Sequence, residues 1–181
     1  MRILTVRVGG KTYTAAAITT GLAREALRCM DEIGELQKKT AALTYAAGAA
    51  EISAAVRARL RCSDRQTALL CRVFGDRFTA DALEDSLTRP ELDALTLSVA
   101  EAVADVAAFY ASGSGAGGDQ TALQAFDKLY HTLATKLRWP VSQIDNADFE
   151  SLMSFVFYRD PDVRIIGGRE YRRARGVPTW L

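Results

Sequence analysis

The sequence predicts a mainly α-helical protein: a helical domain that opens with a short β-hairpin, then a glycine-rich linker, then a small helical C-terminal module. Three observations predict this arrangement. Apolar and polar residues alternate over residues 3–15, apolar residues recur at spacings of three and four through most of the rest, and glycine and serine dominate residues 112–118. The chain has 181 residues, 49% of them hydrophobic and 25% charged, so it can bury one sizeable core.

Residues 3–15 are predicted to form the hairpin. Val6 and Val8 would share one face, Gly9-Gly10 offers a two-residue turn, and Tyr13 would lie opposite Val6. A two-stranded hairpin is marginal alone, so we expect its apolar face to rest on helices. The two glycines do not fit a phosphate-binding loop, because the Lys-Thr pair follows them at once instead of after the longer spacing that such a loop needs.

A first helix should begin near Thr20, which is its predicted N-cap. Its apolar residues repeat every three or four positions: Leu22, Ala26, Cys29, Ile33 and Leu36. An alanine-rich segment follows at 41–60. Alanine gives high helix propensity and little bulk, which permits close approach by another helix, including one from a second copy of the chain.

The end of the alanine-rich segment carries two further signals. Ser63 and Gln66 form a predicted capping box that restarts the helix at about Asp64. Three arginines precede it, and they do not share one narrow stripe: Arg57, Arg59 and Arg61. We interpret them as a solvated helix end, in preference to a phosphate site.

The segment from Leu69 to Leu95 marks its helix boundaries in residue chemistry. Gly75 suits a left-handed C-terminal cap, and Thr79 is the predicted N-cap of a short second helix, with Phe78 packing onto Leu83. The sequence therefore predicts a helical corner that contains no group equipped for catalysis.

A long central helix is predicted after Thr88. Thr88 and Glu91 form a capping box, and Pro90 is tolerated in the first turn, where its missing N–H is not needed. The apolar residues of this helix run over 92–110 at spacings of three and four. The glycine- and serine-rich residues 112–118 then predict a flexible linker.

Two helices are predicted beyond the linker. Asp119 would cap the first, whose apolar residues run over 123–137 and which Trp139-Pro140 ends. Asn146 would cap the second, over 149–157, closed by Asp160-Pro161. The last residues have no strong period. The predicted organisation is therefore 1–111 for the helical domain, 112–118 for the linker and 119–181 for the C-terminal module with its basic tail.

The residue inventory does not favour an enzyme, a cofactor site or a metal site. The single histidine, His131, has no predicted catalytic partner, and a catalytic centre needs convergent groups. Asp145, Asp148 and Glu150 lack the alternation and glycine of a calcium loop, so helix capping explains them more simply. We therefore expect a protein that binds and assembles other proteins.

The cysteines, the lengths of the apolar runs and the first residues indicate the cellular location of the protein. The three cysteines, Cys29, Cys62 and Cys71, show no C-x-x-C spacing and fall on predicted helices, as reduced, partly buried thiols would. No run approaches the ~20 apolar residues of a membrane span. The first residues lack a signal-like apolar core, so we expect a cytosolic protein.

The basic C-terminus suggests a second function class. The formal net charge is only +1, but arginines gather between residues 164 and 181, beside Tyr171 and Trp180. Such a tail could hold phosphates while an aromatic ring stacks on a base. A small helical nucleic-acid-binding regulator is therefore the alternative, although acidic neighbours dilute the field and make nucleic acid the less favoured partner.

Three segments in order resemble the tail assembly chaperones of long-tailed, siphovirus-type bacteriophages and prophages. They are the glycine-turn hairpin with Lys-Thr-Tyr, the helix with Leu-Ala-Arg-Glu-Ala-Leu at 22–27, and Val-Phe-Gly-Asp-Arg-Phe-Thr at 73–79 before Leu83. The resemblance covers about residues 3–110. It implies a non-enzymatic protein that binds the tape measure protein, keeps that long chain soluble and recruits tail tube subunits during tail morphogenesis.

The resemblance also implies a location and a gene structure. Such proteins act in the cytoplasm of the host bacterium and are absent from the mature virion. Many of their genes also produce a longer form through a translational frameshift, which implies that residues 120–181 are such an extension, joined at 112–118.

We expect self-association through the hairpin face and the ends of the central helix, and contact with the major tail tube protein beyond the linker. The candidate partner-binding residues are Tyr13, Phe74, Phe78, Tyr171, Arg172, Arg173 and Trp180.

Overall fold

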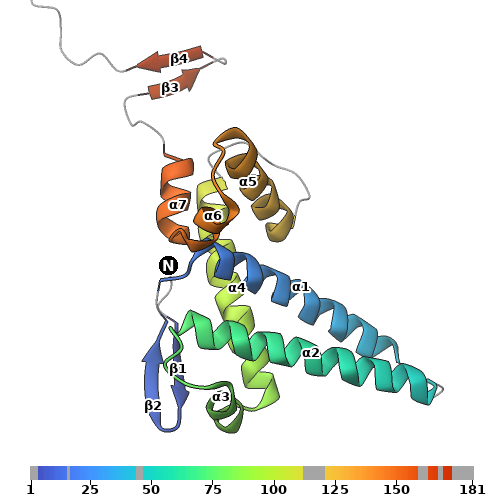
Figure 1. The fold of residues 1–181 in the computed structure, drawn as a ribbon. Coiled ribbons are helices and arrows are strands. Elements are labelled where there is room, and N and C mark those ends of the chain that lie inside the picture. Colours follow the sequence, from blue (N-terminus) through green and yellow to red (C-terminus); the bar gives the residue numbers. More distant parts are fainter. Residues whose placement is uncertain are drawn as a thin grey trace, which may run out of the picture.

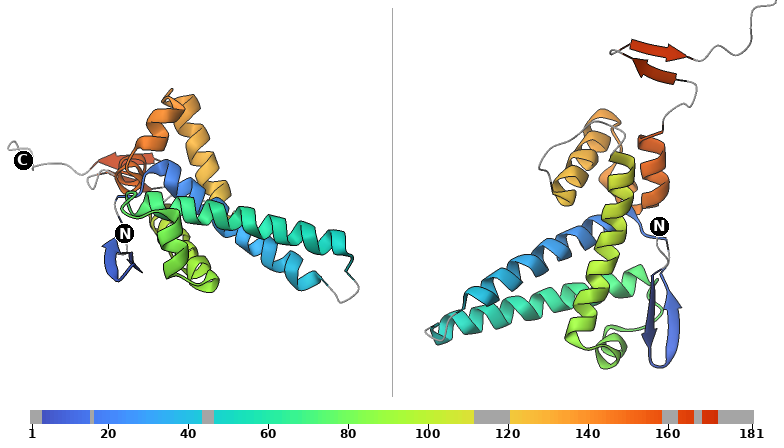
Figure 2. Two further views of the ribbon diagram at one scale, coloured as in Figure 1. Left: turned by 60° about the horizontal axis from the view of Figure 1, so that its bottom comes forward. Right: turned by 180° about the vertical axis from the view of Figure 1, so that it is seen from behind.

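The computed structural model describes residues 4–15, 17–43, 47–111, 121–158, 163–166 and 169–172 (Figure 1). This part of the chain contains seven helices and two separate β-hairpins, so the prediction of a mainly α-helical protein is confirmed. Helices α1 and α2 lie side by side, α4 crosses both, and α5 to α7 lie over one end of α1 and α4 (Figures 1 and 2).

The N-terminal hairpin forms as predicted. Strands β1 (Thr5–Val8) and β2 (Lys11–Thr14) are antiparallel, and Val6 pairs with Tyr13. Gly9 and Gly10 have φ of 55° and 79°, the left-handed conformation that a tight hairpin turn requires. Val6 and Val8 are buried against the helices, which gives this small sheet the support that it lacks alone.

Helix α1 (Thr20–Ala42) carries the predicted apolar face, all of which is buried. The predicted N-cap is wrong by one residue. Thr19 is the cap and accepts from the Leu22 N–H, while the Thr20 hydroxyl donates to the Ala147 carbonyl at 3.0 Å. A tertiary contact thus uses the hydroxyl that local sequence assigned to capping.

Helix α2 (Ala49–Val73) is continuous, so the predicted restart at Asp64 is wrong. Ser63 and Gln66 are buried within the helix, and the Gln66 amide donates to Asp93 of α4 (Arg89–Ala111) at 2.8 Å. Packing against α1 and α4 stabilises an uninterrupted helix at this point. The three arginines at 57–61 therefore lie within α2 and not at a helix end.

The corner between α2 and α4 follows the sequence signals. Gly75, with φ 72°, ends α2: its N–H donates to the Arg72 carbonyl and the next N–H donates to the Cys71 carbonyl, which is a Schellman motif. Thr79 caps α3 (Ala80–Ser86), as predicted. At the start of α4, both the N–H and the hydroxyl of Thr88 donate to the Glu91 carboxylate, and these bonds lower the pKa of Glu91.

The C-terminal helices are α5 (Ala122–Lys136), α6 (Val141–Asn146) and α7 (Phe149–Val156). Their predicted caps are wrong. Thr121 caps α5, whereas Asp119 and residues 112–118 lie outside the described residues. Asp148 caps α7, because Asn146 belongs to α6, a short helix that the sequence analysis missed.

Helices α5 to α7 belong to the main hydrophobic core. Phe126, Leu133, Ile144 and Phe149 are buried in the cluster that also contains the apolar faces of α1 and α4. Gly21 of α1 allows the close approach, since a Cβ there would lie 3.2 Å from the Asp145 carbonyl oxygen.

A second antiparallel hairpin follows α7 in the sequence. Strands β3 (Val163–Ile166) and β4 (Arg169–Arg172) pair with Val163 opposite Arg172. The sequence analysis found no strong period in these residues and did not predict this hairpin. A Gly-Gly dipeptide separates the strands in the sequence, the same signal that predicted the first hairpin.

Candidate functional site

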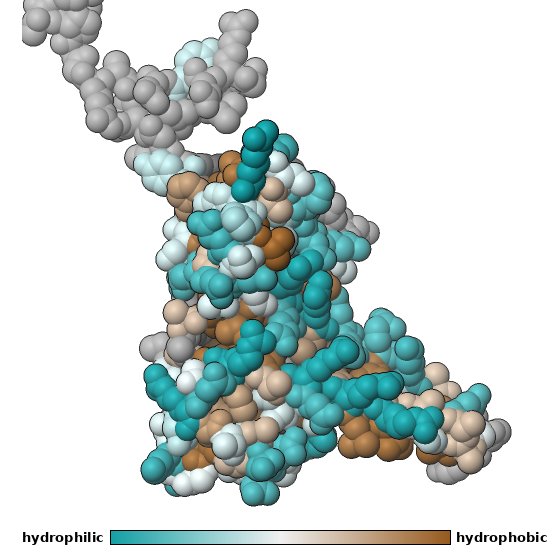
Figure 3. Space-filling model, viewed as in Figure 1, coloured by the Kyte–Doolittle hydropathy of each residue, from teal (hydrophilic) through white to brown (hydrophobic). Residues whose placement is uncertain are grey.

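The C-terminal end of α1 and the N-terminal end of α2 project beyond α4 (Figures 1 and 2). An apolar groove lies between these two ends. Its volume is about 590 Å³. The lining residues come from α1, its C-terminal end, α2 and one residue of α4: Leu36, Gln37, Thr40, Ala41, Leu43, Ile52, Ala55, Val56, Arg59 and Asp93. Figure 3 shows apolar surface gathered on the lower side of this projecting pair. We refer to these residues as the tip groove.

The tip groove lies on the same face of α2 that α4 covers near Arg59 and Gln66. Arg59 and Gln66 of that face both contact Asp93 of α4. Val56 and Ile52 lie three and seven residues before Arg59, on the same side of the helix. They are 52% and 49% exposed, because α4 begins only at Arg89 and does not reach them.

A polar network closes the inner end of the tip groove. Asp93 accepts hydrogen bonds from the Arg59 guanidinium and from the Gln66 amide, at 2.8 Å for the amide. The Asp93 side chain is only 15% exposed. Arg59 is therefore paired within the protein. Ile52 and Val56, further towards the tip, are not covered by any other described residues.

Comparisons of the chain with known protein families, curated proteins and solved structures found no match. The functional assignment therefore depends on the geometry and chemistry of the chain itself. Within the described residues, no helix combines the length and the hydrophobicity of a membrane-spanning segment. The described residues also contain no group of three or more His, Cys, Asp or Glu side chains placed to hold a metal ion.

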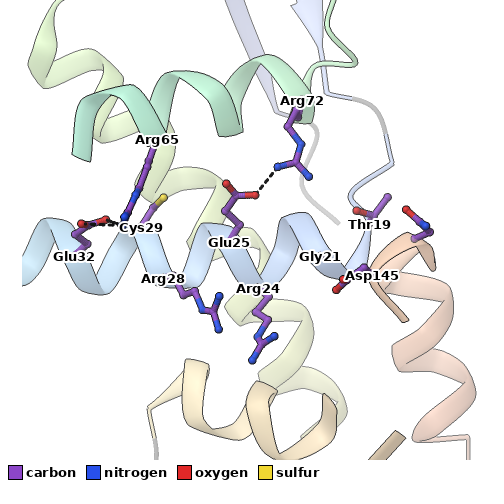
Figure 4. A pocket seen from close by; sticks show the side chains of 11 residues that line it. Thr19, Gly21, Arg24, Glu25, Arg28, Cys29, Glu32, Arg65, Arg72 and Asp145 are labelled. Carbon is purple, nitrogen blue, oxygen red and sulfur yellow. Dashed lines mark hydrogen bonds and ion pairs between the residues drawn. The ribbon is translucent and has the colours of Figure 1, made fainter. Parts of the chain in front are cut away.

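A second cleft, of about 510 Å³, lies between α1, α2 and α6 and is highly charged (Figure 4). Four arginines line it, but three of them have acidic partners: Arg65 pairs with Glu32 at 3.1 Å, Arg72 with Glu25 at 2.7 Å, and Arg24 with Asp127 of α5 at 2.7 Å. These pairs neutralise most of the positive charge that a phosphate would need.

Arg24 connects the charged cleft to the C-terminal helices. Its guanidinium carbon lies 4.5 Å from the centre of the Tyr130 ring, and the Tyr130 hydroxyl donates to Asp145 at 2.9 Å. Burial and this hydrogen bond raise the pKa of Tyr130. Polar contacts at this cleft therefore hold α1 against the C-terminal helices.

The structure separates the predicted partner-binding residues. Tyr13 and Phe78 are half-buried and contact edge to face, with ring centroids 5.1 Å apart. Phe74 lies 5.7 Å from Phe78 and has no exposed surface, so it packs beneath these rings, and its contact with a partner stays a prediction. Tyr171, on β4, is 52% exposed.

The other predicted contacts lie at the C-terminus. Arg172 is the last residue of β4, whereas Arg173 and Trp180 lie outside the described residues.

Further exposed apolar side chains lie on and beside the C-terminal helices, and the sequence analysis missed them. We refer to them together as the aromatic surface: Leu137, Val141, Phe155 and Tyr158, which are 50–73% exposed, with Trp139 stacked on Phe155 at 6.3 Å. A signal existed for Phe155, because it lies off the helical face that Phe149, Leu152 and Val156 share.

The three thiols are buried on helices without disulfides, as predicted. Burial, reinforced by nearby carboxylates, raises the pKa of Cys29 to about 12 and also raises those of Cys62 and Cys71. Since the thiolate is the reactive form, these thiols should react slowly in the folded protein.

We expect Cys29 to make folding pH-dependent in alkaline solution. The folded protein keeps this thiol protonated up to about pH 12, whereas the unfolded chain releases the proton near the ordinary value of 9.0. The thiol therefore contributes its full stability below pH 9, and this contribution falls as the pH rises from 9 towards 12. Denaturant titrations of the wild type and Cys29→Ala across this range should converge with rising pH; parallel curves would contradict the assignment.

Proposed function

We propose that this protein is a non-enzymatic phage tail assembly chaperone, which holds apolar helical segments of the tape measure protein and recruits tail tube subunits. The observation that carries the proposal is the tip groove, an open apolar groove bounded by two helices. A chaperone for a long helical client needs such a surface to shield apolar stretches from water. We infer the tape measure protein as the client from the resemblance of residues 3–110 to tail assembly chaperones.

The aromatic surface supports a second binding role. It lies on α5 to α7, whereas the tip groove lies at the opposite, projecting ends of α1 and α2 (Figure 1). Two separated apolar surfaces on one core suit a protein that brings two partners together. We assign the tail tube subunit to the aromatic surface, in agreement with the expectation that the tube protein meets residues beyond 118.

The alternative, a nucleic-acid-binding regulator, has less support. Arg24, Arg59, Arg65 and Arg72 all have acidic partners within the described residues. Nucleic-acid affinity depends on cations available to phosphates. Retention of the purified protein on DNA with a steep salt dependence would favour this alternative.

Co-expression with the tape measure protein tests the chaperone proposal. We expect the wild type to keep that protein in the soluble fraction and the double variant Ile52→Asn/Val56→Asn to lose most of this effect, because polar side chains would replace the apolar side of the groove. Ala50→Asn/Ala54→Asn is a matched control on the same helix, since these two residues are exposed outside the groove. A tape measure protein that stays soluble with both variants would contradict the proposal.

The same co-expression tests the aromatic surface. Phe155→Ser should leave the tape measure protein soluble but reduce co-purification of the tube subunit, since Phe155 is 65% exposed and contributes little to the core. Point variants are preferable to deleting residues 119–181, because α5 to α7 share the main core and their loss would uncover α1 and α4. Unchanged tube recruitment would place that contact elsewhere.

A further inference from the structure

We infer that Arg138 pairs with a carboxylate of the protein that docks on the aromatic surface, so that this surface selects an acidic segment. The inference rests on the proposed function, because it specifies the chemistry by which the aromatic surface recognises the tail tube subunit. Two independent observations carry it: the backbone of Arg138 is strained, and the charged side chains beside the aromatic surface are cationic.

Arg138 adopts a backbone conformation that arginine disfavours. It follows Leu137, the C-cap of α5, and its φ is 54°, in the left-handed region. Glycine is the usual residue at such a helix end, because a Cβ makes this region unfavourable. The Arg138 side chain is exposed and forms no ion pair or hydrogen bond with another described residue, so nothing in this part of the chain offsets the strain. Strained residues of this kind are typical of binding sites.

The fold holds Arg138 beside the aromatic surface. Leu137 precedes it and Trp139 follows it in the chain. Trp139 packs on the main core and stacks on Phe155 of α7, with ring centroids 6.3 Å apart. The Trp139 N–H also donates to the Leu133 carbonyl at 3.3 Å, which fixes the loop to the end of α5. The strained residue therefore lies next to an aromatic pair that the core positions.

The charged residues beside the aromatic surface determine the sign of the partner. Residues 136–141 and 152–158 contain two cations, Lys136 and Arg138, and no carboxylate. Both cations are exposed, and neither side chain is paired with another described residue. One arginine and two aspartates follow at 159–162, outside the described residues, and the charge summed over all these segments stays positive. Such a surface favours a segment that combines apolar side chains with carboxylates.

Two cations suit a protein partner better than a polyanion. Anionic membranes are recognised by clusters of roughly four to eight lysines or arginines, and nucleic-acid affinity depends on many phosphate contacts. Arginine, tryptophan and tyrosine are also the residue types that contribute most to binding at protein interfaces. We therefore assign to Arg138 an ion pair with an aspartate or glutamate of the tail tube subunit.

Replacing Arg138 separates stability from binding. Arg138→Gly relieves the strain, so the thermal midpoint of the free protein should rise by roughly 2–4 °C. The same change removes the charge, so capture of the tube subunit on co-expression should fall roughly fivefold at low salt. A purely structural residue would not lower capture while raising stability.

Asp76→Gly is the matched control. Asp76 is the other non-glycine residue with a positive φ among those described, also 54°, and it lies in the corner between α2 and α3. Its replacement should raise the thermal midpoint and leave capture unchanged. Arg138→Lys keeps both the charge and the strain and should retain most of the capture, whereas Arg138→Glu should abolish it. The difference between the wild type and Arg138→Gly should shrink at high salt, where charge is screened.

The outcomes separate this inference from the proposed function. Full capture by Arg138→Gly or by Arg138→Glu at low salt would overturn the inference. If Phe155→Ser loses the tube subunit while the Arg138 variants keep it, the aromatic surface recruits the subunit without this ion pair, and the recruitment role stands. A wild type that captures no tube subunit would refute the recruitment role itself, and this inference with it.

Discussion

Replacing Phe74 with alanine is expected to lower the free energy of unfolding by about 3–5 kcal/mol. Phe74 follows α2 directly, has no exposed surface, and lies in the core that joins the first hairpin to α2 and α3. Removal of this ring would leave a cavity. It would also remove the contact with Phe78, whose ring centroid lies 5.7 Å from that of Phe74 and which itself contacts Tyr13. Urea or guanidinium titration followed by circular dichroism measures the change.

Ile52→Ala is the control for Phe74. Ile52 is 49% exposed, so its truncation should change stability by less than about 0.5 kcal/mol. A decrease in the free energy of unfolding of less than about 1 kcal/mol for Phe74→Ala would show that the corner between α2 and α4 is not tightly packed around this ring.

Phe149→Ala should cost a similar amount, about 3–5 kcal/mol, and should destabilise the whole helical core. Phe149 begins α7, has no exposed surface, lies 5.5 Å from the Phe126 ring, and donates its N–H to the Ile18 carbonyl at 2.9 Å. Because this cluster is continuous with α1 and α4, we expect one cooperative unfolding transition, shifted to lower denaturant.

Phe155→Ala on the same helix is the matched control, since this side chain is 65% exposed and should change stability by less than about 0.5 kcal/mol. Two separate transitions in the Phe149→Ala variant, with only one displaced, would show that residues 121–158 fold as an independent unit. The predicted division at 112–118 would then hold energetically as well as in sequence.

Local chemistry accounts for the elements that the sequence predicted correctly. The pair Gly9-Gly10 and the capping residues Gly75 and Thr79 act through backbone conformation and hydrogen bonds within a few residues. Such signals do not depend on the rest of the fold.

Two of the wrong predictions share one cause, which is tertiary packing that overrides a local signal. Ser63 and Gln66 match a capping box, yet burial between helices keeps α2 continuous and turns Gln66 towards Asp93. Thr20 matches an N-cap, yet its hydroxyl donates to Ala147. The β3–β4 hairpin was missed for another reason, since its strands are only four residues long and their charged residues leave no clear apolar alternation beside the Gly-Gly dipeptide.

The candidate site also depends partly on local sequence and partly on tertiary packing. The sequence indicated that the alanine-rich segment permits close helix approach, but it could not indicate which face stays open. Ile52 and Val56 would read as core residues on any helical wheel. They are 49% and 52% exposed because the contact between α2 and α4, made by Arg59 and Asp93, does not extend to them.

Propensity, caps and periodicity were enough to predict that the chain is helical, where the first hairpin and the corner turn, and that the thiols are buried. Which apolar faces are covered could be known only from the packing of the helices. Burial depends on where α4 crosses the α1–α2 pair and on how α5 to α7 dock through Thr20, Arg24 and Tyr130. These are contacts between residues far apart in the chain, so neither the tip groove nor the aromatic surface could be identified from local pattern alone.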